Sequence, residues 1–412
     1  MNLPIPFEFV LFGLTLAGIA VFHQRALAIS IGGLIAILLY EALVTAFPTG
    51  SGAAALAAHA AHEWVTIVNL LLLLVGFEVL SNQFEQSNIS DHLPNLLPDN
   101  WTGGVALLGL VFVLSAFLDN IAAAVLGGVM ARHVFRGRVT VGFLAGIVAS
   151  SNAGGAGSVI GDTTTTIMWL KGVSPVTVLP AYLAAIPAFA VIAPAAALAQ
   201  HRYQPILAND EPDHPLEWRR IGIVVAILLS AVTANVLATS LSEGEEVAPW
   251  LGLALWGAIL ATSLIAKPDW SVMRHGAKGA LFLAALVAAA SLMPLKGLPE
   301  ASWQTAFGLG VLSAVFDNIP LTALALRQGG YDWALLAFSV GFGGSMVWFG
   351  SSAGVALTNL YPEGRSLLRW LKEGWFVPIS YLVGFFVMFL ILGWNPTPEA
   401  GQEAIAAPSA HG

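Results

Sequence analysis

Two short stretches place Asp and Asn in the middle of long apolar runs. Residues 115–121 read SAFLDNI, and residues 313–319 read SAVFDNI. An ionisable residue inside an apolar span is expensive to keep there and usually has a function. A glycine-rich stretch follows each copy, with the same spacing from a glycine pair (Gly154 and Gly155, Gly343 and Gly344) to a later glycine. We interpret this pattern as an internal duplication that built two related half-sites.

The composition is typical of a polytopic membrane protein. Hydrophobic residues make up 57% of the 412 residues, and only 10% are charged, whereas soluble domains carry roughly 25% charged residues. The chain has no Cys, which excludes disulfides, thiolate metal sites and thiol chemistry. No basic patch indicates a nucleic-acid partner, and no nucleophile–base set indicates an enzyme.

Apolar runs of roughly 17–25 residues predict membrane-spanning helices. We expect about ten of them, at residues 7–22, 26–47, 64–81, 141–170, 176–199, 221–240, 250–266, 279–293, 333–361 and 375–394. The segment 48–62 is expected to be a loop or a short interfacial helix.

Two further apolar ranges, 104–131 and 303–329, carry Asp-Asn near their middle. Each is either a long tilted helix with a buried Asp or a re-entrant hairpin of two half-helices. Asp and Asn suit a hairpin tip because they are good N-caps, and Pro320 suits the first turn of an outgoing helix.

The distribution of basic residues favours the hairpins, because basic residues are enriched on the cytoplasmic side. With the N-terminus outside and both hairpins returning to their side of entry, only Lys171, Lys296 and Arg327 of the 16 basic residues lie outside. Each half then has five crossings and one hairpin. The predicted fold class is therefore an all-α polytopic membrane protein with an inverted-topology repeat and discontinuous helices at the membrane midplane, a common plan in secondary transporters.

This topology divides the chain into consecutive parts. Residues 1–199 form the first repeat, with its hairpin at 104–131 and a broken helix at 141–170. Residues 200–220 form a cytoplasmic linker. Residues 221–394 form the second repeat, with a hairpin at 303–329 and a broken helix at 333–361. The tail 395–412 is expected to be disordered, and both termini are expected outside the cytoplasm.

The glycine-rich breaks provide candidate ligands for a hard cation. Four glycines in eight residues, from Gly154 to Gly161, are poor helix interior, so the helix should break there and restart at Asp162 or Thr163. Freed carbonyl groups and Asn, Ser and Thr oxygens suit a cation such as sodium. A small-residue packing face is the alternative, although packing alone does not need Asn152 and Asp162 together.

The second half repeats this design, with Ser351 in the place of Asp162. The candidate cation- and proton-binding residues are Asp119, Asn120, Asn152, Gly155, Asp162, Thr163, Thr164, Asp317, Asn318, Gly344, Ser345, Ser351 and Ser352. Those predicted to hold sodium are Asp119, Asn120, Asp317 and Asn318. Glu78 is a candidate proton relay, although a glutamate late in a span is more often interfacial.

Taken together, these motifs resemble the ion transporter superfamily, and most closely the NhaD-type sodium/proton antiporters among the ArsB/NhaD-like permeases. The matching stretches are FLDN at 117–120, NAGG at 152–155 with IGD at 160–162, FDNIPL at 316–321, and GGS at 343–345 with GSSAGV at 350–355. Arsenite permeases and sodium-coupled carboxylate symporters are more distant relatives. The resemblance implies paired hairpins, a midplane site and a homodimer. The chain departs from close relatives at Ala122–Ala124, where hydroxyl residues are common, and at Gly157.

Two functions are compatible with these residues. In a sodium (or lithium)/proton antiporter, Asp119, Asp162 and Asp317 would bind cation and proton alternately. In a sodium-coupled symporter of a carboxylate or bicarbonate, helix N-termini would hold the anion; arsenite efflux is a third and weaker alternative. The predicted location is a bacterial inner membrane. The expected partners are the lipid bilayer and small inorganic ions, with sodium as substrate or coupling ion and no other cofactor.

Overall fold

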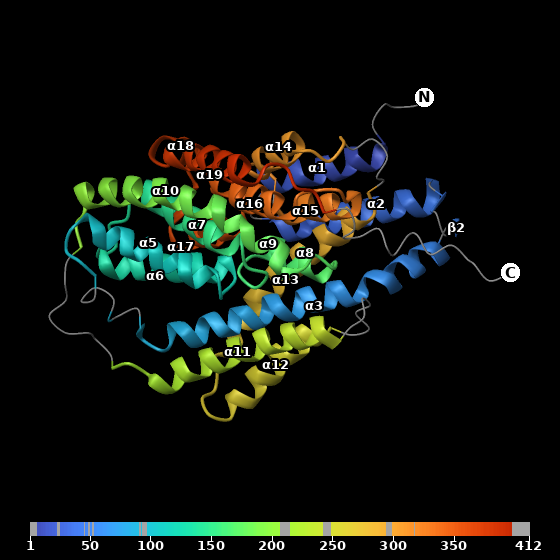
Figure 1. Ribbon diagram of the computed structural model, residues 1–412. Helices are drawn as coiled ribbons and strands as arrows, with labels where there is room; N and C mark the ends of the chain where they lie inside the picture. The colour runs from blue at the N-terminus through green and yellow to red at the C-terminus, as the bar shows by residue number, and fades with distance from the viewer. Residues whose placement is uncertain are drawn as a thin grey trace. The chain divides into compact units, whose positions relative to one another are not determined.

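Helices make up nearly all of the computed structural model, which describes residues 6–22, 25–44, 46–47, 50–51, 53–89, 92, 97–206, 215–241, 249–293, 299–316 and 318–397 (Figure 1). The β-structure within these ranges is one antiparallel pair, β1 (Ala46–Phe47) with β2 (Gly50–Ser51). The chain forms two compact units. Unit 1 comprises Met1–Leu96 and Ala208–Pro294, and unit 2 comprises Leu97–Leu207 and Leu295–Gly412.

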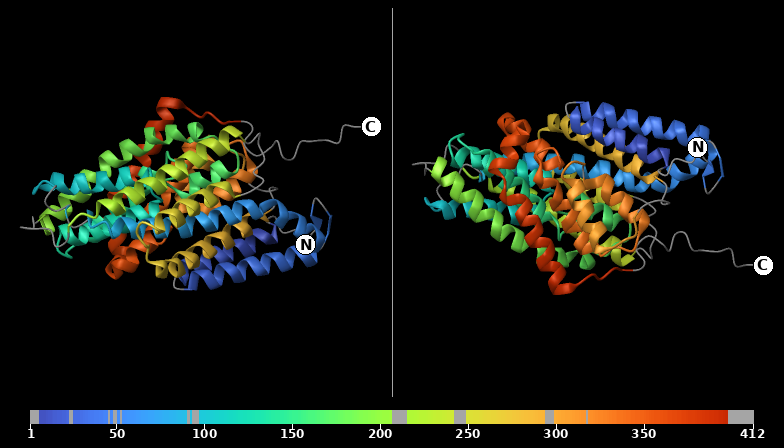
Figure 2. Two further views of the ribbon diagram at one scale, coloured as in Figure 1. Left: turned by 90° about the horizontal axis from the view of Figure 1, so that it is seen from below. Right: turned by 90° about the horizontal axis from the view of Figure 1, so that it is seen from above.

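Unit 1 is a bundle of apolar helices in which α3 is central. Its helices are α1 (Phe7–Val21), α2 (Ala26–Val44), α3 (Ala53–Glu85), α11 (Trp218–Leu241), α12 (Trp250–Ser263), the 3₁₀ turn η3 (Trp270–Val272) and α13 (Met273–Ser291). Helix α3 packs on α11, α12 and α13, and α2 packs on α1 and α13 (Figure 2). Two hydrogen bonds join α3 to α12: Gly252 N donates to Asn69 Oδ1 at 2.8 Å, and Trp256 Nε1 donates to Leu72 O at 2.8 Å.

The start of α3 differs from the sequence prediction. We expected a loop or separate helix over 48–62 and a span from residue 64, but α3 begins at Ala53 and is continuous to Glu85. Alanine is the best helix former, so the Ala/His run extends the spanning helix by several turns at its N-terminal end.

Unit 2 contains two series of helices that match in order. The first is α5 (Trp101–Ser115), α6 (Asn120–Val134), α7 (Val141–Gly155), α8 (Thr163–Leu170), α9 (Pro175–Val178), η2 (Leu179–Ala181) and α10 (Tyr182–Tyr203). The second is α14 (Trp303–Ser313), α15 (Asn318–Gln328), α16 (Trp333–Gly343), η4 (Gly344–Met346), α17 (Ser352–Leu360), η5 (Pro362–Arg365), α18 (Leu367–Glu373) and α19 (Phe376–Leu392). Each Asp-Asn stretch therefore falls between two helices, and each glycine-rich stretch does the same.

Corresponding positions of the two series make the same contacts. Ser115 Oγ on α5 donates to Ser151 O on α7 at 2.6 Å, and Ser313 Oγ on α14 donates to Val340 O on α16 at 2.7 Å. The backbones also approach closely at two glycines. A Cβ on Gly154 would meet the carbonyl oxygen of Phe112, and a Cβ on Gly343 would meet that of Gly310. The duplication visible in the sequence is therefore repeated in the packing of α5 on α7 and of α14 on α16.

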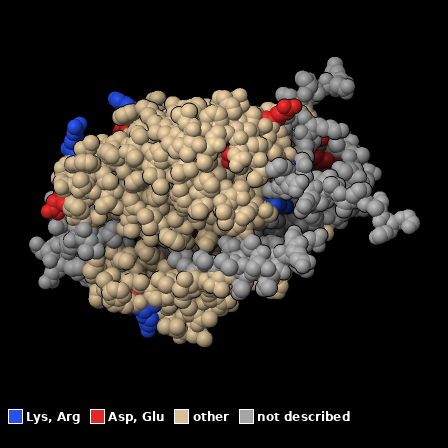
Figure 3. Space-filling model, in the orientation of Figure 1, with Lys and Arg blue, Asp and Glu red and all other residues tan. Residues whose placement is uncertain are grey.

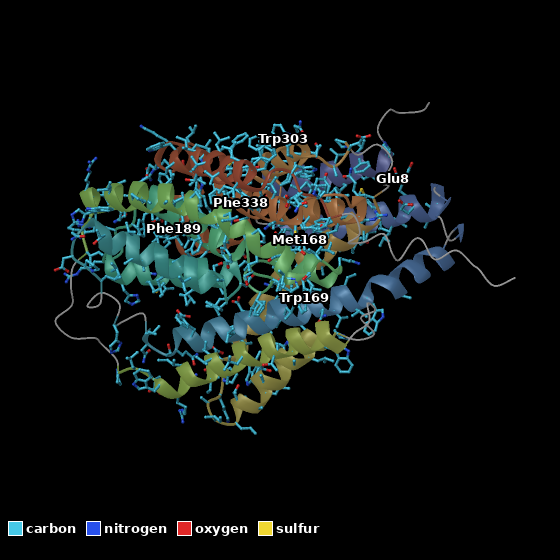
Figure 4. The ribbon with its side chains drawn as sticks, in the orientation of Figure 1. Glu8, Met168, Trp169, Phe189, Trp303 and Phe338 are labelled. Atoms are coloured by element: carbon cyan, nitrogen blue, oxygen red, sulfur yellow. The ribbon has the colours of Figure 1, made fainter. Side chains whose placement is uncertain are left out.

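Aromatic side chains pack between the helices of unit 2. Phe189 on α10 lies 5.1 Å from Phe112, and Phe338 on α16 lies 5.1 Å from Phe342, between ring centroids (Figure 4). The rings of Phe338 and Tyr381 are also stacked, which joins α16 to α19. These contacts join α10 to α5 and fix α16, which carries the second glycine-rich break, against α19.

The surface of the helices is that of a polytopic membrane protein. Four helices of the described chain are long and apolar enough to cross a membrane, or five if α18 and α19 count as one bent span. Six shorter apolar helices, including α5, α6 and α7, accompany them. Large hydrophobic side chains are widely exposed, with Leu390 82% and Leu43 81% accessible. On the face in Figure 3 charged side chains are few, as expected for a lipid-facing surface.

The described part of the expected tail is held against the loop before α16. Asn395 N donates to Asp332 Oδ2 at 3.2 Å, and Thr397 N donates to Tyr331 O at 3.3 Å. The other oxygen of Asp332 caps α16 by accepting from Leu335 N at 3.0 Å, and burial raises the pKa of this carboxyl. Residues 398–412, like 207–214 of the expected linker, lie outside the described residues.

The close approaches at Gly154 and Gly343 lead to a first prediction. Gly154→Ala and Gly343→Ala each place a methyl group against a backbone carbonyl, and overpacking of this kind costs about 1–3 kcal/mol. We expect both to lower the unfolding temperature of the purified protein, measured by tryptophan fluorescence. Gly308→Ala is the matched control on α14, because its Cβ would meet nothing within 4 Å. If the two variants unfold at the wild-type temperature, these contacts do not constrain the fold.

Candidate functional site

Polar side chains converge where the helices of unit 2 begin and end. Asn120 is the first residue of α6, and Asn318 is the first residue of α15. Asn152 lies in the last turn of α7, while Ser345 lies in η4 directly after α16. Both glycine-rich breaks and both Asp-Asn stretches thus contribute to one cluster.

The N-cap residues of α8 and α17 occupy equivalent positions at the two breaks but differ in chemical type. Asp162 caps α8, because its Oδ1 accepts from Thr164 N at 3.1 Å. Ser351 caps α17, because its Oγ accepts from Gly354 N at 3.3 Å. Asp and Ser are both favoured N-caps, so either residue type can accept the hydrogen bond that the start of the helix requires. Only the first half therefore carries a carboxylate at this position.

The side chain of Asn152 connects the two halves. Its Oδ1 accepts from Asn120 Nδ2 at 2.9 Å. Its Nδ2 donates to Ser345 Oγ at 2.8 Å and to Ser351 Oγ at 3.3 Å. One amide from the first half thus binds two hydroxyl groups from the second.

The carboxylate of Asp162 is the second connection. Its Oδ1 accepts from Asn120 Nδ2 at 3.2 Å and from Asn318 Nδ2 at 3.5 Å. Asn318 Nδ2 also donates to Thr164 Oγ1 at 2.8 Å. The other oxygen, Oδ2, lies only 2.5 Å from the position that a Cβ on Gly341 would occupy. The absence of a side chain at Gly341 therefore makes room for the carboxylate against α16.

The cluster is almost completely buried. Asp162, Asn152, Thr164 and Ser345 are 0% exposed, and Asp119 is 4% exposed. The charged side chains buried in the described part of unit 2 are Asp119, Asp162 and Asp332, and no Lys or Arg is among them. Asn120 Oδ1 is buried without a hydrogen-bond partner among the described groups. The site thus combines buried carboxyl groups with an amide oxygen that has no hydrogen-bond partner among the described groups.

The remaining predicted residues lie around this cluster or apart from it. Asp119 is the N-cap of α6, with Oδ2 accepting from Ile121 N at 3.2 Å, and Thr163 Oγ1 donates to Asp162 Oδ1 at 3.4 Å. Ser352 is the first residue of α17. Asp317 lies outside the described residues.

The two predicted glycines allow close backbone approach at the breaks. A Cβ on Gly155 would meet the carbonyl oxygen of Gly161, and one on Gly344 would meet that of Gly350 at 2.7 Å. Glu78 belongs to α3 of unit 1 and is half-buried there.

Two side chains outside the sequence motifs also support the cluster by direct hydrogen bonds. Tyr182 OH donates to Gly154 O at 3.0 Å, and Trp370 Nε1 donates to Ser345 O at 3.3 Å. Both lie far from the motifs in sequence, so no local pattern could have indicated them. Ser115 and Ser313 could have been found, since they open the duplicated stretch.

The donor set suits a hard cation that competes with protons. Carboxylate, amide and hydroxyl oxygens are the ligands such cations prefer. Among the described residues, no three His, Cys, Asp or Glu side chains gather as a transition-metal site would require. A buried carboxylate can also hold a proton in place of the cation, because both neutralise its charge.

Comparison with known proteins places the chain among transporters. The sequence profile of the citrate transporter family (CitMHS) matches residues 16–343. Sodium/proton antiporter 1 of Arabidopsis thaliana is 27% identical over 395 residues, covering 85% of this chain and 66% of that protein. Sodium/proton antiporter 2 of the same plant is 26% identical, covering 72% of this chain and 76% of the relative. The Na⁺/H⁺ antiporter NhaD of Vibrio parahaemolyticus is 27% identical, covering 72% and 83%.

The position of Asn152 leads to a second prediction. Asn152→Ala removes three hydrogen bonds and leaves buried hydroxyl groups with fewer partners, which costs about 1–3 kcal/mol. We expect a clear fall in unfolding temperature. Ser380→Ala is the control, since Ser380 is equally buried but bonds only within α19, to Phe376 O. Equal effects of the two substitutions would mean that the cluster adds nothing to the cohesion of unit 2.

Proposed function

We propose that this chain, which belongs to the citrate transporter family, is a secondary transporter that exchanges sodium or lithium ions for protons. The observation that carries the proposal is the buried Asp162 carboxylate, whose Oδ1 accepts from Asn120 and Asn318 of both halves. The names of the antiporter relatives support the same activity. The chain spans 66% of the length of the first of these relatives. We therefore base the proposed activity on the chain's own site in addition to the names of the relatives.

The mechanism we propose is competition at buried carboxylates. A cation binds Asp162 only after its proton has left, so sodium and protons exclude each other. Asp119 and Asp317 are proposed to act in the same way, from the duplicated stretch that carries them. Asn120 Oδ1, which is buried and open to a ligand among the described groups, would add an oxygen to the bound cation. Glu78 remains a candidate relay for the released proton.

The family description favours a second candidate, sodium-coupled symport of a carboxylate. A citrate-like anion needs positive charge or several free N–H donors at its site. The buried charged groups of the described chain are all acidic, namely Glu8, Glu41, Asp119, Asp162 and Asp332. An acidic site repels an anion, so we place cation/proton exchange first.

The finer architecture is also a proposal. We propose that the two halves, 1–199 and 221–394, are inverted repeats, and that α5–α6 and α14–α15 are re-entrant hairpins. The repeated contacts of Ser115 and Ser313 support the duplication, and the cap at Asp119 fits a hairpin tip. A homodimer in a bacterial inner membrane, with both termini outside the cytoplasm, completes the proposal.

The exchange mechanism leads to a third prediction. Asp119→Asn and Asp317→Asn keep side-chain size while removing charge. Each is expected to abolish sodium-driven proton movement in inverted vesicles, with normal amounts of folded protein. Asp162→Asn is expected to reduce exchange strongly, because Oδ1 can still cap α8 but the charge is lost. In the wild type, apparent sodium affinity should weaken as pH falls, because protons occupy the carboxylates.

Controls separate this mechanism from the alternative. Symport predicts sodium-dependent uptake of labelled citrate without counter-movement of protons. Asp269→Asn tests removal of a carboxylate from an exposed loop and should leave exchange unchanged. Wild-type exchange by both tip variants and by Asp162→Asn would exclude the carboxylate mechanism.

The proposed topology gives a fourth prediction, which the cysteine-free chain makes simple to test. Single cysteines replacing Arg136 and Glu363 are expected to react with an impermeant thiol reagent only from the cytoplasmic side. A cysteine replacing Glu245 is expected to react only from outside. Labelling of position 245 from the cytoplasm would contradict the inverted arrangement, whatever ion is transported.

A further inference from the structure

Helix α18 presents an exposed apolar row on the surface of unit 2. Leu367, Leu368 and Leu371 are 42%, 80% and 42% exposed, and Trp375 directly after the helix is 57% exposed. With about 100° between successive residues, the three leucines occupy one side of the helix, and Trp375 follows the helix after Gly374. Their exposure indicates a surface that is covered by something apolar.

A basic row lies next to the apolar one. Lys372 and Arg369 are exposed and lie on the side of α18 next to the leucines. Arg365 lies on η5, just before α18. Adjacent apolar and basic rows are typical of helices that lie in the interface of a membrane. The axis of α18 is inclined by 59° to that of α19, and one face of α19 exposes apolar side chains such as Leu390 and Ile391. A helix so inclined to a spanning neighbour can rest among lipid headgroups.

The third side of α18 faces the protein and reaches the cation cluster. Trp370 is 1% exposed, and its Nε1 donates to Ser345 O at 3.3 Å. The hydroxyl of Ser345 accepts from Asn152 at 2.8 Å. One buried indole therefore links α18 to a residue at the centre of the cluster.

A second link runs through Glu373 to the helix that carries Asn152. Glu373 Oε1 pairs with Arg369 Nε at 3.2 Å, while Oε2 accepts from Gly142 N at 3.2 Å. Gly142 lies in the first turn of α7. An anion that draws Arg369 away from Glu373 would therefore change the environment of the α7 N-terminus.

We propose that α18 is a binding surface for anionic phospholipids, and that its occupancy regulates ion exchange at the cluster through Trp370 and Glu373. The apolar row contacts acyl chains, and Arg369 and Lys372 contact the headgroup phosphate. These residues belong to a segment assigned to the cytoplasmic side by the positive-inside rule, where the leaflet is anionic and attracts basic segments. The lipid-binding part is independent of the transported ion, whereas the regulatory part rests on the proposed function.

Lipid contact can be measured on the cysteine-free background. A bimane label on Leu368→Cys is placed in vesicles of phosphatidylcholine and phosphatidylglycerol, with bromine on the acyl chains of one lipid or the other. We expect brominated phosphatidylglycerol to quench several-fold more effectively than brominated phosphatidylcholine. A label on Leu390→Cys, 82% exposed on α19, should be quenched equally by both.

Charge variants test the headgroup contact. Arg369→Gln with Lys372→Gln should remove the preference for phosphatidylglycerol. Arg136→Gln with Arg138→Gln removes the same charge from an exposed loop and should leave it. Added glycerol 3-phosphate should not compete, because it lacks acyl chains. Three outcomes would overturn the proposal. Absence of quenching by either lipid would indicate that another protein segment covers the helix, and equal quenching by both lipids would indicate a non-selective surface. Competition by glycerol 3-phosphate would indicate a soluble phosphate ligand.

Transport measurements test the regulation. Sodium-driven proton movement is compared in phosphatidylcholine vesicles with and without phosphatidylglycerol. The wild type should be stimulated several-fold, and the Arg369–Lys372 double variant should not. Trp370→Phe should keep the lipid preference but lose the stimulation, because it lacks the N–H that reaches Ser345. Exchange insensitive to phosphatidylglycerol would refute the regulation, whereas no exchange in any lipid would refute the proposed function and leave the quenching result standing.

Discussion

Breaking a helix in apolar surroundings leaves backbone N–H and C=O groups that must find partners within the protein. Unit 2 contains such breaks after α7 and α16, and much of its chemistry follows from satisfying them. Asp162 and Ser351 accept hydrogen bonds from backbone N–H groups in the first turns of α8 and α17. Tyr182 donates to the carbonyl of Gly154 in the last turn of α7. The residues that complete the backbone are thus the same residues that form the cluster.

This shared use explains why the site is polar but not strongly charged. Asn120 donates to Asn152 and to Asp162, and Asn318 donates to Asp162, so these amides supply hydrogen bonds without adding charge. A second carboxylate at Ser351 would lie beside the amide of Asn152, which is bonded to Asn120, a partner of Asp162, and would repel Asp162. A neutral cap in the second half therefore leaves Asp162 as the only carboxylic acid among the two N-caps at the breaks.

The sequence predicted the elements of this site because its signals are local. Ser115 to Asn120 and Asn318 carry the duplication, four glycines between Gly154 and Gly161 predict the break, and Asp162 begins the next helix as its residue type suggests. The partners of each group could not be predicted, since the bond from Asn152 to Ser345 joins distant segments. Trp370 belongs to no motif, and the early start of α3 at Ala53 depends on helix propensity that a hydropathy window ignores.

Close backbone packing gives this network its rigidity. Gly154 and Gly343 bring α7 and α16 against the carbonyl groups of α5 and α14, and Gly341 admits the carboxylate of Asp162 beside α16. A helix fixed by such contacts cannot shift by itself without losing them, and every described member of the cluster belongs to unit 2. In the proposed mechanism, access to the cluster would therefore change by concerted movement of packed helices rather than by rotation of one side chain. An inclined surface helix bonded to η4 and to α7 is well placed to influence such a movement.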